Sequence, residues 1–373
     1  MRSLRVALCF GTYPPERNGG ADSVARLAAA LAAAGHEVHV LTSRGEPADE
    51  TLHGVRVHRI VDDWTVRGGR AARRRVRTLL RRERVDVLHV FFPDSVLQGR
   101  YQSPALLAPR DTKVVTTWWN LGLGRRSPLA IKVSSLALLA RSSVLSSHDP
   151  VYVAALERLV LRRKPVGWLP VGSNFAEAAT RQRADSIPTV GFFGQLDFTR
   201  GVDTLFDAVA RLSRPEIRLR MLGSAGRPER YEGDPEFVRL LDLPQRLGIA
   251  DQVEWTGFLD DREVPQALAD LDLCVLPYRR NSLGRSALAA AFAAGAPVVL
   301  GGYGERVAPL EPGRHVALVE PDDAEALAQA IANLLDDPTE RERLAAGSRE
   351  AAAFFAWPRI AELAVELYRE ALR

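Results

Sequence analysis

The residues best suited to chemistry in this sequence are three arginines, Arg279, Arg280 and Arg285, which lie close together around Gly284. A guanidinium group is charged at any physiological pH and offers paired N–H donors that match the oxygen atoms of a phosphate. Three such groups in one short polar segment predict a binding site for an anionic ligand.

The elements around these arginines would hold them at the end of a strand. Residues 273–276 form a short apolar run that Pro277 ends, which is typical of a buried strand in a parallel sheet. Residues 287–294 are rich in alanine and predict a tightly packed helix, which Gly295 ends before the next strand, residues 298–300. The arginine-rich loop therefore joins the carboxyl end of a strand to the N-terminus of a helix, where phosphates bind in α/β sheets.

The composition is that of a globular protein with more than one domain. The chain has 373 residues, of which 46% are hydrophobic and 26% charged, so two domains of similar size are expected. Its cysteines, Cys9 and Cys274, both lie in apolar runs, which argues against a disulfide framework or a cysteine metal site and fits a reducing compartment. The sequence contains no apolar run of membrane-spanning length, and residues 6–10 predict a strand and not a signal peptide. We therefore expect a cytoplasmic protein.

Strands and helices alternate along both halves of the chain. In the first half, the runs that predict strands are residues 6–10, 38–41, 55–60, 85–92, 114–117 and 166–171. In the second half they are residues 189–193, 218–222, 252–256, 273–276, 298–300 and 317–319. The polar stretch 172–188 predicts a linker between the two series. This alternation predicts an α/β fold with two Rossmann-like domains, residues 1–172 and 173–357, and a final helix, residues 358–373, that crosses back onto the first domain.

Several residues near strand ends in the first half are candidates for binding a ligand. Gly19 and Gly20 would let a ligand approach the backbone, although a tight turn explains them equally well. Trp118 and Trp119 would form an apolar platform for a sugar, whereas a core position is the commoner use of paired aromatic residues. For His148, a general base is one interpretation and a hydrogen-bonded structural residue is the other.

A helix predicted over residues 67–84 is strongly basic. Its apolar residues share one face, and the rest of its surface carries arginines: Arg70, Arg73, Arg74, Arg75, Arg77, Arg81 and Arg82. A solvated face is the common explanation of such a pattern, and peripheral contact with the anionic inner face of a membrane is the alternative. Nucleic acid is disfavoured because no aromatic stacking platform accompanies the arginines. A second helix, predicted over residues 129–145, is largely apolar and is expected to pack beside the ligand site.

Five segments, in the right order along nearly the whole chain, resemble the GT-B-type glycosyltransferases of family four. These segments are GG-x6-LAxxLAxxGHEVHVLT (residues 19–42), FFGQLDFTRGVDTLFDAV (192–209), VEWTGFLDDREVPQALADLDLCVLPY (253–278), AAGAPVVLGGYGE (293–305) and PGRHVALVEPDDAEALAQAI (312–331). Members of this family are retaining enzymes that use nucleotide sugars. The resemblance implies two Rossmann-like domains that face each other across a cleft, with the acceptor in the first and the nucleotide diphosphate sugar in the second.

The resemblance also implies roles for individual residues. Arg200 lies where the family has a diphosphate-binding lysine, and Glu305 matches a family position near the donor, so both are predicted catalytic residues. The predicted donor-binding residues are Gly20, Gly194, Gln195, Arg200, Phe258, Tyr278, Ser282, Gly284, Arg285, Ser286 and Glu305. The predicted acceptor-binding residues are Trp118, Trp119, Asn120 and His148.

The resemblance implies catalysis without a metal ion or other cofactor, because arginines and the N–H groups of a helix N-terminus would stabilise the leaving diphosphate. Asp270 and Asp272 form a DxD pattern that elsewhere binds metal. They precede the predicted strand 273–276 and so lie at the wrong end of the sheet for the donor.

The chain departs from the family pattern where the donor sugar and ribose would bind. Two glutamates that family members usually carry are replaced by Ser282 and Ala290, a histidine by Trp119, and an arginine by Gln195. Three interpretations stay open: a glycosyltransferase with an altered donor pocket in which nearby arginines replace the carboxylates, a catalytically silent binding subunit, and a sugar-nucleotide epimerase. The first is favoured because the predicted diphosphate-binding features are all present.

Overall fold

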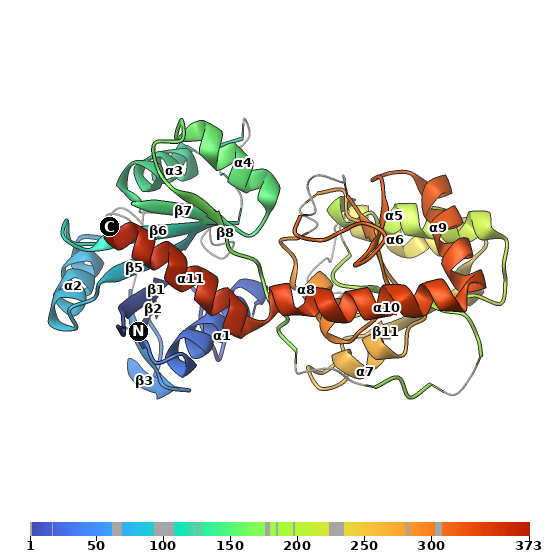
Figure 1. Cartoon of the computed structure of the whole chain (residues 1–373), viewed down its shortest axis with the longest axis horizontal. Coiled ribbons are helices and arrows are strands. Elements are labelled where there is room, and N and C mark those ends of the chain that lie inside the picture. The colour runs from blue at the N-terminus through green and yellow to red at the C-terminus, as the bar shows by residue number, and fades with distance from the viewer. Residues whose placement is uncertain are drawn as a thin grey trace. The chain divides into compact units, whose positions relative to one another are not determined.

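A computed structural model describes residues 2–16, 18–61, 69–92, 108–119, 121, 123–124, 127, 129–175, 180–183, 186–196, 198–223, 235–280, 283–302 and 308–373. The chain forms two compact units, each with its own predominantly parallel sheet (Figure 1). The first unit comprises Met1–Asn174 and Ala356–Arg373, and the second comprises Phe175–Phe355. Both units belong to the predicted α/β class. In the described part of the chain, no helix has the length and apolar character needed to cross a bilayer.

The first unit is built on a sheet with the strand order β3-β4-β2-β1-β5-β6-β7-β8. Its neighbouring strands are parallel, apart from the antiparallel pair β3–β4. The strands are β1 (Arg5–Cys9), β2 (Glu37–Ser43), β3 (Asp49–Leu52), β4 (Val55–Val61), β5 (Val87–Phe92), β6 (Lys113–Trp118), β7 (Val144–Ser147) and β8 (Val166–Trp168). The order reverses between β1 and β5, and ligands of open α/β sheets bind at such a switch point.

Helices cover both faces of this sheet and give it two separate cores. Its helices are α1 (Gly19–Ala33), α2 (Gly69–Arg82), α3 (Leu129–Arg141), α4 (Pro150–Leu159) and α11 (Trp357–Leu372). One core contains residues of α1 and α11, and the other contains residues of α2, α3 and α4. The last helix, α11, thus packs on the first unit, as expected for the C-terminal segment. Its Tyr368 is fully buried, and the Tyr368 hydroxyl is 2.8 Å from Nδ1 of His89 on β5.

The structure corrects the single helix predicted over residues 129–145. Helix α3 ends at Arg141, where the ammonium group of Lys164 donates to the carbonyls of Leu139, Ala140 and Ser142. Strand β7 follows at once. The prediction failed because an apolar run has the same composition in a buried strand as in a buried helix, and periodicity cannot separate the two.

The second unit has a wholly parallel sheet with the order β11-β10-β9-β12-β13-β14. The strands are β9 (Thr189–Phe193), β10 (Arg218–Leu222), β11 (Val253–Gly257), β12 (Leu273–Leu276), β13 (Val298–Gly301) and β14 (Ala317–Val319). The α-helices are α5 (Val202–Leu212), α6 (Pro235–Arg246), α7 (Val264–Ala269), α8 (Ser286–Ala293), α9 (Ala324–Asp336) and α10 (Pro338–Ala352). Single 3₁₀ turns are η3 (Phe198–Arg200), η5 (Ala250–Gln252) and η7 (Ala353–Phe355). Here the strand order reverses between β9 and β12, so the loops after these two strands meet at the switch point.

Candidate functional site

The loops that follow β9 and β12 are joined to each other at the carboxyl edge of the second unit's sheet. The N–H of Arg279 donates to the carbonyl of Thr199 over 3.0 Å. Gly201 has φ +66°, and a Cβ atom on it would lie 2.0 Å from the carbonyl oxygen of Pro277. Only glycine fits there, because both the left-handed backbone and the close approach exclude a side chain. The two loops therefore pack directly against each other.

Arg200 lies on this edge and packs against the loop that leaves β9. A Cβ atom on Gly194 would lie 2.7 Å from Nη1 of Arg200, and Gly194 itself has φ +140°. The missing side chain at Gly194 therefore makes room for the guanidinium group. Gln195, the next residue, is exposed.

Arg285 holds a second guanidinium group at the same edge. It is half-buried, it is the N-cap residue of α8, and its Nη2 donates to Oγ1 of Thr199 over 3.1 Å. Its guanidinium carbon lies 5.0 Å from the ring centroid of Tyr278, a cation–π distance. Tyr278 is fully buried and its ring packs against Arg285, and its contact with a donor stays a prediction. Gly284 and Ser286 flank Arg285 in half-buried positions at the start of α8.

The third predicted arginine, Arg279, is a structural residue. Its guanidinium group binds both carboxylate oxygens of Asp203 at 2.8 and 2.9 Å and also contacts Thr204 and Asp322. Burial acts to lower the pKa of Arg279, but the bonds to the two carboxylates raise it above its usual value. The anionic partners of Arg279 thus come from the protein, which corrects the interpretation of all three arginines as ligand-binding groups. Arg280 is exposed.

Asp270 and Asp272 bind backbone and guanidinium groups at the amino end of β12. Asp270 accepts from the N–H groups of Gln182 and Arg183, and Asp272 accepts from the N–H of Thr189 over 2.8 Å. Burial acts to raise the pKa of Asp272, but these amide and arginine contacts lower it overall. The two carboxylates thus fasten the start of the sheet, away from the edge that carries Arg200.

The remaining donor-site predictions have mixed outcomes. Phe258 follows β11 at the same carboxyl edge and is 56% exposed. Ala290 is buried within α8 and only 3% exposed, so the position of a usual family glutamate belongs here to the helix core. Ser282 and Glu305 lie outside the described residues.

The two tryptophans at the end of β6 point to opposite faces of the first unit's sheet. Trp118 is fully buried in the core formed with α2, α3 and α4, and its ring packs edge-on against Phe92. This corrects its prediction as an acceptor-binding residue. Trp119 packs on the other core, with its ring centroid 4.0 Å from that of His148. Asn120 lies outside the described residues.

His148 follows β7 and presents a neutral imidazole beside Trp119. Its Nδ1 is 2.5 Å from the carbonyl oxygen of Leu169, which can only accept, so Nδ1 carries the proton. Burial lowers the pKa of His148 to about 4 despite this bond. Its Nε2 is consequently an acceptor at neutral pH. Among the described residues, neither this Nε2 nor the indole N–H of Trp119 has a hydrogen-bond partner, although both atoms are buried.

Gly20 has a local structural role at the start of α1. Its N–H and that of Ala21 donate to the side chain of Asn18, which caps the helix. A Cβ atom on Gly20 would lie 2.7 Å from the ring of Phe10. Packing and capping therefore explain this glycine, and its contact with a donor stays a prediction.

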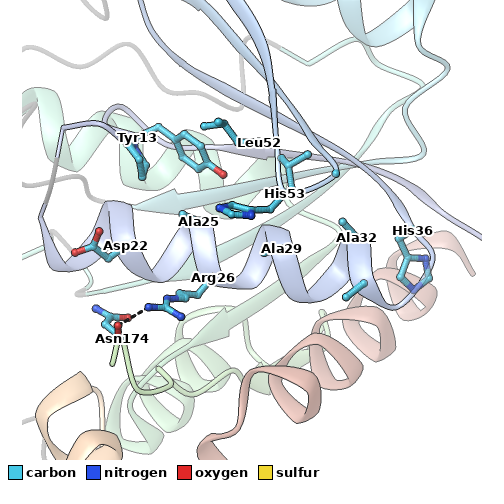
Figure 2. A pocket seen from close by; sticks show the side chains of 14 residues that line it. Tyr13, Asp22, Ala25, Arg26, Ala29, Ala32, His36, Leu52, His53 and Asn174 are labelled. Carbon is cyan, nitrogen blue, oxygen red and sulfur yellow. Dashed lines mark hydrogen bonds between the residues drawn. The ribbon is translucent and has the colours of Figure 1, made fainter. Parts of the chain in front are cut away.

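A groove of about 810 Å³ along α1 was not foreseen from the sequence (Figure 2). Its lining includes Tyr13 and Ala29, and at one end the guanidinium group of Arg26 donates to the carbonyl of Asn174 over 2.7 Å. The alanines of residues 25–33 are the signal that could have predicted it, because small side chains on the outer face of a helix leave space beside it. None of the predicted donor- or acceptor-binding residues that the structure describes lines this groove.

Two family models match separate stretches of the chain. Residues 17–167 match Glycosyltransferase Family 4, and residues 187–337 match Glycosyl transferases group 1. Each stretch falls within one of the two units.

Similar proteins cover between half of the chain and nearly all of it. A glycogen synthase of Mycobacterium tuberculosis is 28% identical, with 99% of this chain and 95% of that protein covered. A D-inositol 3-phosphate glycosyltransferase of Stackebrandtia nassauensis is 31% identical over 51% of this chain and 43% of its own length. Among solved structures, the sucrose-phosphate synthase of Thermosynechococcus elongatus has a TM-score of 0.77 at 22% identity, covering 99% of this chain and 98% of that one. Anabaena HepE in complex with UDP-glucose has a TM-score of 0.71 at 18% identity, covering 97% and 98%.

Proposed function

Because the chain belongs to the GT-B glycosyltransferases of the family-four type and transfers a sugar from a nucleotide sugar, we propose that Arg200 and Arg285 bind the diphosphate of the donor. The observation that carries this proposal is the pair of guanidinium groups at the switch point of the second unit. Thr199 connects them, since it accepts from Arg285 and directly precedes Arg200.

The chemistry of this edge suits a leaving nucleoside diphosphate. Negative charge builds up on the phosphate oxygens as the bond to the sugar breaks, and guanidinium groups held in place before the reaction stabilise that charge. The first N–H groups of α8, at Ser286 and Ala287, add neutral donors and the positive end of the helix dipole. The proposal assigns neutralisation of the diphosphate to these groups instead of a metal ion, so activity should survive chelation with EDTA.

We assign the base of the nucleotide to the neighbourhood of Phe258, whose exposed ring is suited to stacking. Anabaena HepE, which shares the fold, has been solved with UDP-glucose, so UDP-glucose is the first donor to test. The contacts of the ribose of the nucleotide are expected to differ from those of related enzymes, because Ala290 is a buried residue of α8 and offers no carboxylate.

We assign the acceptor hydroxyl to the edge of the first unit that carries Trp119 and His148. The Nε2 atom of His148 can accept a hydrogen bond from a hydroxyl, and the indole of Trp119 can donate one. With a pKa of about 4, His148 is too weak a base to remove a proton efficiently at neutral pH. This supports a retaining, front-face transfer in which a phosphate oxygen of the donor accepts the proton. The anomeric configuration of the product, measured by NMR, tests the stereochemistry.

The central experiment is calorimetric titration of the protein with UDP, ADP and GDP. Arg200→Ala should weaken binding of the preferred diphosphate by about 1.5–3 kcal/mol, because a charge-assisted contact is lost. Arg280→Ala is the matched control: the side chain is exposed on the same edge, and its removal should change affinity little. Failure of all three nucleotides to bind, or equal affinities of the two variants, would overturn the assignment.

A further inference from the structure

Helix α3 of the first unit turns its apolar side chains outward. Leu129, Val133 and Leu136 are 76%, 58% and 59% exposed, and their spacing places them on one face of the helix. The opposite face buries Ser134 and Ser135, which are 3% and 0% exposed. The hydroxyl of Ser135 donates to the carbonyl of Ile131, so its burial costs little. A surface helix normally has the reverse arrangement, with polar residues outside.

The next helix on this face also exposes apolar side chains. Val151 and Leu159 of α4, and Leu161 just beyond it, are 39%, 47% and 70% exposed. Helices α3 and α4 cover the same face of the sheet, because Leu138 and Leu156 lie in the same core. Exposed apolar side chains on two helices that cover one face of a sheet indicate an interaction site.

The same face of the first unit is strongly basic. Helix α2 contributes to the same core through Val76 and Leu80, and exposed arginines on its solvent side include Arg74, Arg75, Arg81 and Arg82. The sequence has no acidic residue from position 112 to position 148, which includes all of α3. On α4 one acid, Glu157, is half-exposed.

Helix α2 itself cannot insert an apolar face into lipid. Its apolar residues Ala72, Val76, Leu79 and Leu80 are buried in the unit's own core. The arginine-rich helix therefore offers charge alone, and α3 offers the apolar surface. The two helices are neighbours, because both hold the same short segment: Arg77 on α2 donates to the carbonyl of Ala108, and Arg141 at the end of α3 donates to that of Pro109.

We propose that the face formed by α2, α3 and α4 binds the surface of an anionic lipid bilayer, with Leu129, Val133 and Leu136 inserted between headgroups. Arginines attract such a surface electrostatically and exposed leucines add apolar burial, the two signals that peripheral binding requires. A second copy of the chain fits less well. A symmetric dimer through this face would bring the arginines of both copies together, and like charges repel. This inference rests on the first unit alone and is independent of the proposed donor site.

The test is co-sedimentation of the full chain with vesicles. Vesicles of phosphatidylcholine are compared with vesicles of equal parts phosphatidylcholine and phosphatidylglycerol, at low and high salt. Binding is expected to the anionic vesicles, and salt should weaken it by screening. The double variant Val133→Gln, Leu136→Gln leaves the charge unchanged and should reduce binding by about tenfold or more, because apolar burial is lost. The double variant Arg74→Gln, Arg81→Gln should also reduce vesicle binding, and the remaining binding should depend less on salt.

The matched control is Val238→Gln, which replaces a half-exposed apolar residue on α6 of the second unit and should bind like the unchanged protein. Retention of nucleotide affinity and thermal midpoint shows that each variant is folded. The proposal is overturned if neither vesicle binds the protein, or if the Val133/Leu136 variant binds undiminished. It is also overturned if sedimentation without lipid shows a dimer that this variant dissociates, since the face would then belong to a second copy.

Discussion

At the carboxyl edge of the second unit's sheet, two guanidinium groups lie half-buried on loops, whereas at the corresponding edge of the first unit the candidate group is a buried, neutral imidazole. A guanidinium group carries a fixed positive charge at physiological pH. His148 is neutral because burial has lowered its pKa to about 4. The same parallel-sheet architecture thus offers fixed positive charge in one unit and an uncharged hydrogen-bond acceptor in the other. That division suits a reaction between an anionic donor and a neutral hydroxyl.

The largest effect is expected at Gly201, where the two loops of the charged edge meet. Gly201→Ala places a Cβ atom 2.0 Å from the carbonyl oxygen of Pro277 and strains a backbone with φ +66°. We expect a loss of stability of more than about 3 kcal/mol, together with loss of nucleotide binding. Thermal unfolding and calorimetry measure the two effects.

Gly248→Ala is the matched control for this substitution. Gly248 has φ +72°, but its Cβ position has nothing within 4 Å. It should show the backbone strain alone, about 1–2 kcal/mol. If both variants lose the same stability, the close contact of the two loops contributes nothing.

The uncharged edge of the first unit, which carries His148, should instead make the stability of the protein depend on pH. The pKa values of His148 and His89 are about 4 and about 3, both lowered mainly by burial, whereas the unfolded chain binds these protons near pH 6.5. Below pH 6.5 the unfolded state therefore binds more protons than the folded state. The free energy of unfolding has its full value above that pH and falls as the pH drops. The expected loss is about 1.4 kcal/mol per pH unit for each histidine. Denaturant unfolding between pH 7 and pH 5 measures it, and His148→Asn should reduce the slope.

Substitution of Arg279 measures how much its ion pairs stabilise the carboxyl edge of the second unit's sheet. Arg279→Ala leaves Asp203 without its two-pronged partner and should destabilise the protein by about 1–3 kcal/mol, because one partner of a largely buried pair is removed. Arg280→Ala, the exposed neighbour, should have a thermal midpoint close to that of the unchanged protein. Equal midpoints for the two variants would show that Arg279 is not structural.

The sequence predicted the edges of both sheets better than the roles of single residues at them. Strand ends follow from apolar runs and from glycine or proline, so the loops that carry Arg200, Arg285 and His148 were expected where they are found. The sequence could not show that Arg279 pairs with Asp203, because the partners are far apart in the chain and meet only when the first turn of α5 lies beside the loop after β12. It also could not show which face of the sheet Trp118 takes, since shifting an alternating pattern by one residue exchanges the two faces.

The smallest expected effect, that of Trp119→Phe, distinguishes acceptor binding at the first unit from nucleotide binding at the second. Trp119→Phe keeps an aromatic ring beside His148 but removes the indole N–H. If that N–H binds the acceptor, the KM for the acceptor should rise about fivefold, the value of one neutral hydrogen bond, while the affinity for the nucleotide diphosphate stays unchanged. Initial rates at varied acceptor concentration, with calorimetry for the nucleotide, measure both quantities. A change in nucleotide affinity with no change in acceptor KM would contradict the division of roles between the two units. A packing defect alone would instead lower the thermal midpoint without changing either constant, so the midpoint of the variant must be measured alongside.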